Sequence, residues 1–110
     1  LGDVYKRQIY MSFTATLRRY SDPTIAQNNA YAYLGKHAVL YQSNRKNKKY
    51  MIYNPDAQKW IHFGQIGYTD FTKHQNQERR LDYLRRTSKI KGDWRKDPYS
   101  PNNLSRNILW

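Results

Sequence analysis

The stretch Trp60-Ile-His-Phe63-Gly64-Gln-Ile-Gly67 joins the two patterns that decide the fold. Residues 59–63 are rich in aromatic and β-branched side chains, which is typical of a strand. The two glycines predict a tight turn between them. Beyond the turn, residues 74–88 carry apolar side chains at helical spacing. The stretch therefore predicts a strand, a turn and a basic helix in succession.

Both faces of that strand carry large side chains. Trp60 and His62 share one face, while Ile61 and Phe63 share the other, because side chains alternate across a strand. Neither set is fully polar. We therefore expect both faces to be partly covered.

Two further strands are predicted upstream, at residues 36–42 and 49–53. The polar loop 43–47 separates them, and Asn54-Pro-Asp-Ala57 forms a strong turn signal before the third strand. Short polar connections favour antiparallel pairing between neighbours. The sequence thus predicts a three-stranded antiparallel meander.

Helices are expected on either side of this sheet. Asp22 and Pro23 suit the cap and first position of a short helix over residues 24–34, whereas residues 11–22 fit either a helix or a short strand. Ser100 and Pro101 suit the start of a C-terminal helix. That helix is expected to return to the core the side chains of Leu104, Ile108, Leu109 and Trp110.

The helix over residues 74–88 is predicted to face the core with a narrow stripe formed by Leu81, Leu84 and Ser88 and extended by Tyr83. Asp70 or Thr72 is expected to cap it. Asp82 and Arg86 have the spacing of an i,i+4 ion pair. In the segment that follows, Trp94 and Tyr99 are expected to pin the chain to the body.

The predicted fold class is α+β: a small antiparallel three-stranded meander packed with a basic helix and a short C-terminal helix. Residues 34–110 are expected to form a single domain, and residues 11–33 an N-terminal arm with a short helix as one option. Residues 1–10 are interpreted as a non-native extension, since residues 1–8 resemble translated sequencing-adapter read-through and Met11 is a reasonable start.

The charge of the chain indicates a polyanionic partner. Its 110 residues include 20 lysines and arginines against 8 acids, a net charge of +12. Such an excess attracts nucleic acid or, as a second candidate, an anionic membrane surface. The chain has no cysteine, which excludes disulfides and thiolate metal sites, and no run is apolar and long enough for a membrane span.

Basic residues are concentrated in two places. Residues 73–96 hold 9 basic side chains against 3 acids, and the loop between the first two strands holds a second cluster. Arginine suits phosphate because its planar guanidinium donates two parallel hydrogen bonds. The alternative is a solvated surface that keeps the protein soluble. The candidate nucleic-acid contacts are Lys73, Arg79, Arg80, Arg85, Arg86, Lys89 and Lys91, and in the loop Arg45, Lys46, Lys48 and Lys49.

Aromatic residues on the strands could offer base-stacking platforms, as in single-strand binding proteins. The candidates are Tyr41, Tyr50, Tyr53 and Trp60. Aromatic side chains on strands more often pack in a core or pair across strands. We therefore rank core packing above base stacking for this set.

A nuclease site is the remote alternative. It would require an acid among Asp70, Asp93 and Asp97 to converge with His62 or His74. With only 8 acids in the chain, ordinary roles are favoured: His62 inside the sheet, Asp70 as a cap and Asp97 at the turn before Pro98. We predict no catalytic residue, no metal site and no cofactor.

Several motifs together resemble a known family. They are His62-Phe-Gly64, Gly67-Tyr-Thr-Asp-Phe-Thr-Lys-His74, the arginine-rich helix, Gly92-Asp-Trp94 and the segment from Asp97 to Trp110. Over residues 34–110 the chain resembles small basic proteins of uncharacterised function encoded by large DNA viruses of algae and protists. The resemblance implies a viral source and a domain boundary, and it supplies no catalytic residues.

The sequence thus favours a non-enzymatic viral protein that binds nucleic acid through the phosphate backbone, DNA before RNA, in genome packaging or inside the virion. The expected location is the host cytoplasm or viral factory, or the virion itself. The alternative is a minor virion protein that contacts acidic protein surfaces. Other virion proteins are further candidate partners.

Overall fold

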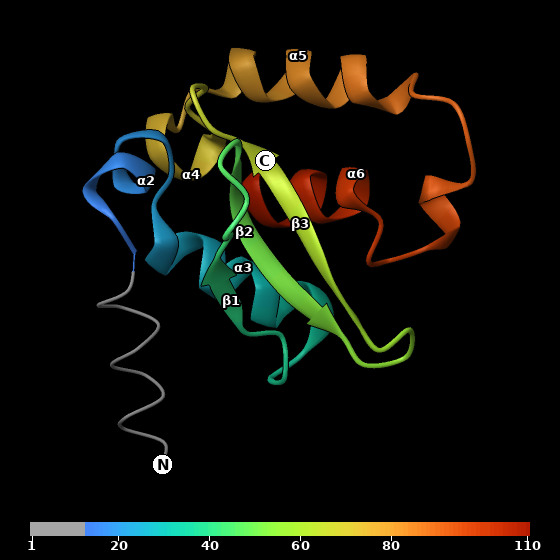
Figure 1. Cartoon of the computed structure of the whole chain (residues 1–110). Helices are drawn as coiled ribbons and strands as arrows, with labels where there is room; N and C mark the ends of the chain where they lie inside the picture. Colours follow the sequence, from blue (N-terminus) through green and yellow to red (C-terminus); the bar gives the residue numbers. More distant parts are fainter. Residues whose placement is uncertain (1–12) are drawn as a thin grey trace.

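The computed structural model describes residues 13–110, so the extension predicted for residues 1–10 lies outside the described residues. The fold is α+β, as predicted: one three-stranded sheet with helices before and after it (Figure 1). Its strands are β1 (Leu40–Gln42), β2 (Lys48–Asn54) and β3 (Lys59–Gln65). Its helical elements are α2 (Ala15–Tyr20), α3 (Pro23–Leu34), α4 (Phe71–His74), α5 (Gln77–Ser88), the 3-10 turn η1 (Trp94–Lys96), α6 (Pro101–Leu104) and its π-helical continuation η2 (Ser105–Leu109).

The sheet is an antiparallel meander in the order β1-β2-β3, which confirms the predicted topology. Tyr50 lies opposite Gln42 on one side and Phe63 on the other. The first strand is shorter than predicted, because the backbone of residues 35–39 closes on itself: the Ala38 amide donates to the Gly35 carbonyl and the Val39 amide to the His37 carbonyl. Those groups are therefore not available to a strand ladder.

The helix α3 matches its prediction closely. The Asp22 carboxylate accepts hydrogen bonds from the Thr24 and Ile25 amides, and Pro23 occupies the first turn. The segment before it, which the sequence left open between helix and strand, is the helix α2, because the Thr14 hydroxyl caps it by accepting from the Leu17 amide.

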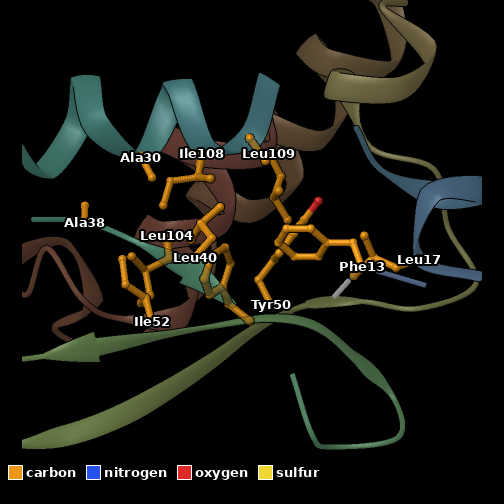
Figure 2. Close-up of a cluster of buried hydrophobic side chains, with 12 residues drawn as sticks. Phe13, Leu17, Ala30, Ala38, Leu40, Tyr50, Ile52, Leu104, Ile108 and Leu109 are labelled. Carbon is orange, nitrogen blue, oxygen red and sulfur yellow. The ribbon is translucent and has the colours of Figure 1, made fainter. Parts of the chain in front are cut away.

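The core lies between one face of the sheet and the helices α3, α6 and η2 (Figure 2). Its largest fully buried side chains include Tyr50, Phe63, Leu40 and Ile52 from the sheet. The helices contribute Leu17, Ala26, Ala30, Leu104, Ile108 and Leu109. The described part of the predicted arm, residues 13–33, therefore belongs to the same core as the sheet.

Gly64 does not bound the turn as predicted. The strand β3 continues through it to Gln65, and the turn begins at Ile66. Gly64 has a φ of +82°, and a side-chain carbon placed on it would lie 2.9 Å from a Leu109 methyl carbon. Glycine is needed here because η2 passes directly against the strand.

The helix predicted from residue 74 to 88 is two helices. Asp70 caps α4 and Asn76 caps α5, and Gln75 between them adopts a left-handed conformation with φ 55°. Thr72, the other candidate cap, lies inside α4 and bonds to Asp70. Two capping side chains six residues apart start two helices, which the apolar spacing alone did not reveal.

The predicted core stripe of α5 is confirmed in part: Tyr83, Leu84 and Ser88 are half-buried, but Leu81 is 53% exposed. Thr87, which is buried, and Arg80, which is half-buried, take part in the inward face instead of Leu81. Polar contacts hold this face: Arg106 donates to the Leu84 carbonyl and the Thr87 hydroxyl, both at 2.6 Å.

Tyr99 attaches the C-terminal segment to the body as predicted, because its side chain packs against the core. The hydrogen bonds of Trp94 stay within the segment: its indole donates to the Ile90 carbonyl, and its main-chain carbonyl accepts from the Ser100 hydroxyl and the Asn103 side-chain amide. Ser100 then caps α6. In Figure 1, α3 and α6 pass behind the strands. Within residues 13–110, no helix combines the length and apolar character that crossing a membrane requires.

Candidate nucleic-acid interface

A cleft of about 660 Å³ separates α5 from the α6–η2 segment and from the open end of the β2–β3 hairpin, where Lys48 pairs with Gln65. Its floor is apolar, with Phe63 and Leu109 among the lining residues. Its walls carry basic and aromatic side chains from elements far apart in the sequence. The lining residues include Lys48, Tyr68, Arg79, Asp82, Tyr83 and Arg86.

The cleft brings the two basic clusters together. Arg79 and Arg86 lie seven residues apart on α5, two helical turns, so both face the same side. Lys48 begins β2 on the opposite wall. One exposed member of the loop cluster and two members of the helix cluster, separated by about thirty residues of sequence, therefore line the same cavity.

One acidic side chain, Asp82, also lines the cleft. Its carboxylate lies 3.6 Å from the Arg85 guanidinium, and both side chains are largely exposed. The predicted partner was Arg86, four residues on, and the structure pairs Asp82 with Arg85 instead. Exposed pairs of this kind contribute little to stability. Arg86 itself lies over the Tyr83 ring at 5.7 Å.

Arg80 has a structural position that conflicts with its predicted role as a phosphate contact. Its Nε donates to the main-chain oxygen of Trp110 at 2.6 Å, and its guanidinium lies 5.4 Å from the centre of the Phe71 ring. The side chain is half-buried between α4 and the C-terminal segment. We therefore remove Arg80 from the candidate interface.

Lys49 is likewise excluded, because it is only 2% exposed. Its ammonium group lies 3.0 Å from the Asp70 carboxylate and donates to the Tyr68 carbonyl at 2.7 Å. Burial lowers the pKa of Lys49, and the neighbouring Asp70 carboxylate opposes that shift. A lysine buried in an internal ion pair in this way is not available to a phosphate.

The remaining candidates lie on the surface. Lys73, Arg85, Lys89 and Lys91 are exposed but do not line the cleft. Arg45 and Lys46 line a smaller hollow of about 170 Å³ on the other side of Lys48. Lys48 lines both cavities, so basic side chains continue from the hairpin loop into the cleft.

Sequence reasoning missed the aromatic wall of the cleft. The Tyr83 and Trp110 rings stack at 4.2 Å between centres and 8° between planes, and Tyr68 is 70% exposed at the cleft. It also missed Arg106, which ties η2 to α5. The helical spacing of Arg80, Tyr83, Leu84 and Thr87 could have indicated the inward face of α5. A search for apolar residues overlooks it, because Arg80 and Thr87 are polar.

The strand aromatics divide between the two faces of the sheet. Tyr50 is fully buried in the core and donates its hydroxyl hydrogen to Ser21 at 2.7 Å, and burial raises its pKa. Tyr50 is therefore unavailable for base stacking. Tyr41, Tyr53 and Trp60 lie on the opposite face, where Trp60 contacts the other two rings.

The two histidines considered for a nuclease site have structural partners. A 2.6 Å hydrogen bond joins His62 Nδ1 to the Ser43 hydroxyl, and His74 Nδ1 accepts from the Asn76 amide. Burial lowers the pKa of both; nearby cations, Arg45 and Lys48 for His62, add to the effect. Both imidazoles are thereby held toward the neutral form.

The acids of the nuclease alternative have roles of their own. Asp70 pairs with Lys49 and caps α4, and Asp93 lies 3.9 Å from Lys96 at the surface. Asp97 accepts from the Tyr99 amide in the turn after η1, as predicted. Among residues 13–110, no three histidine, aspartate or glutamate side chains gather in a group that could hold a metal ion.

Residues 38–87 match the model of a family described as a family of unknown function (DUF5754). The match covers the sheet, α4 and nearly all of α5, and thus the loop cluster and the arginines of α5, but it ends before Lys89 and Lys91. It stops before the C-terminal segment that closes the cleft. Neither the curated proteins nor the solved structures contain a match to the chain.

Proposed function

We propose that this protein is a non-enzymatic nucleic-acid-binding protein that holds the phosphate backbone along the cleft between α5 and the β2–β3 hairpin. One observation carries the proposal: Lys48 faces Arg79 and Arg86 across a single cavity. Cations on two walls can contact successive phosphates of one strand. Basic residues that serve only solubility need not line the same cavity.

The charge of the whole chain supports the same proposal. A net charge of +12 attracts a polyanion over the distance set by ionic strength, and arginine forks then fix it by paired hydrogen bonds. The proposed ligand is DNA in preference to RNA. The proposed role is in genome packaging or inside the virion. The viral source, with the viral factory or the virion as location, rests on the sequence resemblance of residues 34–110.

The test is a binding titration with labelled DNA at about 50 and 200 mM salt, because phosphate contacts weaken steeply over that range. The triple variant Lys48→Gln, Arg79→Gln, Arg86→Gln is expected to bind more weakly. It should also flatten the slope of log affinity against log salt by about 2 to 3, since each phosphate contact contributes about 0.7 to 0.9. Asp82→Asn should raise affinity, because it removes the negative charge at the cleft.

A matched control separates the cleft from net charge. Arg19→Gln, Lys36→Gln, Lys96→Gln removes the same charge from exposed positions that do not line the cleft. This control is expected to change affinity much less than the cleft variant. Equal losses from the two triple variants would show that the cleft has no special part, and absence of binding at the lower salt would reject the function.

A protein partner is the second candidate. Leu81, in the middle of α5, and Ile90, two residues beyond its end, are 53% and 49% exposed. Apolar side chains mixed with arginine are typical of protein interfaces. In that case the protein would be a minor virion component that contacts an acidic protein surface, and the titration would show no binding to DNA.

A further inference from the structure

The sheet face opposite the core carries an aromatic cluster formed by Tyr41, Tyr53 and Trp60. The register places Tyr53 directly opposite Trp60, and directly opposed residues share a face. The Trp60 ring lies 5.5 Å from Tyr41 and 5.4 Å from Tyr53, at angles of 80° and 64°. These three rings form one continuous aromatic surface across all three strands.

Much of this surface is open to solvent. Trp60 is 46% exposed and Tyr53 is 42% exposed. The helices α3 and α6 pack on the other face of the sheet, and Figure 1 shows them behind the strands. Contiguous exposed apolar patches are typical of interaction sites, whereas single exposed aromatic side chains are not, and these rings contact one another.

Positive charge lies near one end of the cluster. His62 shares the face of Trp60, and the charges of Arg45 and Lys48 add to burial in lowering its pKa. At the other end Lys59 is exposed, but it alternates to the opposite face of β3 from Trp60. About 16 Å separates Trp60 from the Lys48 end of the sheet, at 3.3 Å for each strand residue. One acid, Asp56, lies in the turn before Lys59.

We propose that this aromatic surface stacks the bases of single-stranded nucleic acid, with the phosphates directed along Arg45 and Lys48 toward the cleft. The proposal rests on the proposed function and adds the form of nucleic acid that the protein selects. A single strand exposes base faces that an open aromatic ring can cover. A duplex hides those faces in its own stack, so it can use the cleft alone.

The test compares three labelled ligands: a deoxythymidine strand of about 20 nucleotides, the matching uridine strand, and a DNA duplex of that length. The unmodified protein should bind the single strands more tightly. Trp60→Ala should weaken single-strand binding by about 5- to 150-fold and leave duplex binding unchanged. Trp60→Phe, which keeps a ring face, should retain most of the affinity. The two single strands show whether the ribose hydroxyl matters.

Tyr31→Ala on α3 is the matched control, because Tyr31 is 37% exposed on a helix that packs behind the sheet. It should change nothing. Tyr53→Ala gives a second, independent loss if Trp60→Ala fails to fold. If single strand and duplex bind equally well, and Trp60→Ala and Tyr53→Ala bind as the unmodified protein does, the stacking proposal is wrong while the phosphate-binding function stands. If neither form of nucleic acid binds, both the stacking proposal and the phosphate-binding function are rejected. The protein-partner function would then remain.

Discussion

At the scale of single residues, the environment decides what a charged side chain does. Lys49 and Lys48 are neighbours in a basic run and both line the cleft, yet Lys49 is buried in an ion pair with Asp70 whereas Lys48 is partly exposed. Lys49 alternates to the side of the strand that meets the α4 cap. The carboxylate of Asp70 serves two purposes there, because it accepts from Thr72 through one oxygen and from Lys49 through the other.

Breaking this pair is expected to be costly. Lys49→Met should lower the free energy of unfolding by about 3–5 kcal/mol, since it leaves the Asp70 carboxylate buried without its cation. The measurement is urea unfolding at neutral pH, with the midpoint and slope both fitted.

The double variant Lys49→Met, Asp70→Asn is the control for that prediction. It removes both charges and keeps a side-chain oxygen for the α4 cap, so it should recover a large part of the lost stability. If the double variant loses as much as the two single changes added together, the ion pair is not the source of the cost.

At the scale of elements, close approach fixes how the strand β3 meets η2. A side-chain carbon at Gly64 would lie 2.9 Å from a Leu109 methyl and 3.1 Å from Lys49 Cβ. Leu109 is 1% exposed, so it is enclosed by the core and has little room to move. The absence of a side chain at Gly64 therefore sets the depth at which the C-terminal segment packs.

Gly64→Ala should lower the free energy of unfolding by about 2–4 kcal/mol, because backbone strain at positive φ adds to crowding in the core. Gly67→Ala is the matched control: its φ is +103°, but nothing lies within 4 Å of the added carbon. That variant should lose only about 1–2 kcal/mol. Thermal and urea unfolding of the two variants measure the difference, and equal losses would show that the Leu109 contact is not limiting.

At the scale of the whole molecule, net charge opposes compactness. With 20 basic residues against 8 acids, the folded chain holds like charges closer together than the unfolded chain does. Salt screens this repulsion, so its effect on stability is opposite in sign to its effect on phosphate binding.

The melting temperature should therefore rise when salt increases from about 50 to 500 mM in the absence of nucleic acid, by about 4–8 °C for each kcal/mol of repulsion screened. Differential scanning calorimetry measures this shift. The control variant Arg19→Gln, Lys36→Gln, Lys96→Gln, which has three fewer charges, should show a smaller rise. A melting temperature that falls with salt would show that attractive pairs outweigh the repulsion.

Local signals in the sequence determined much of this fold. The caps at Asp22 and Ser100, the turn at Asn54 and the meander itself were all predictable, because each depends on side chains within a few residues of the backbone they bond. The strong excess of basic residues, and its concentration in two segments, was also plain from the sequence.

Only the tertiary structure decided which residues form the candidate site. Arg80 and Lys49 have structural roles because they bond to Trp110 and Asp70. These partners lie 30 and 21 residues away in the sequence, so no local pattern indicated them. The same long-range packing moved the inward face of α5 from Leu81 to Thr87 and separated Tyr50 from Trp60. The sequence alone determined most of the local elements and the total charge. Packing determined exposure, because burial depends on contacts between distant segments that no local pattern specifies.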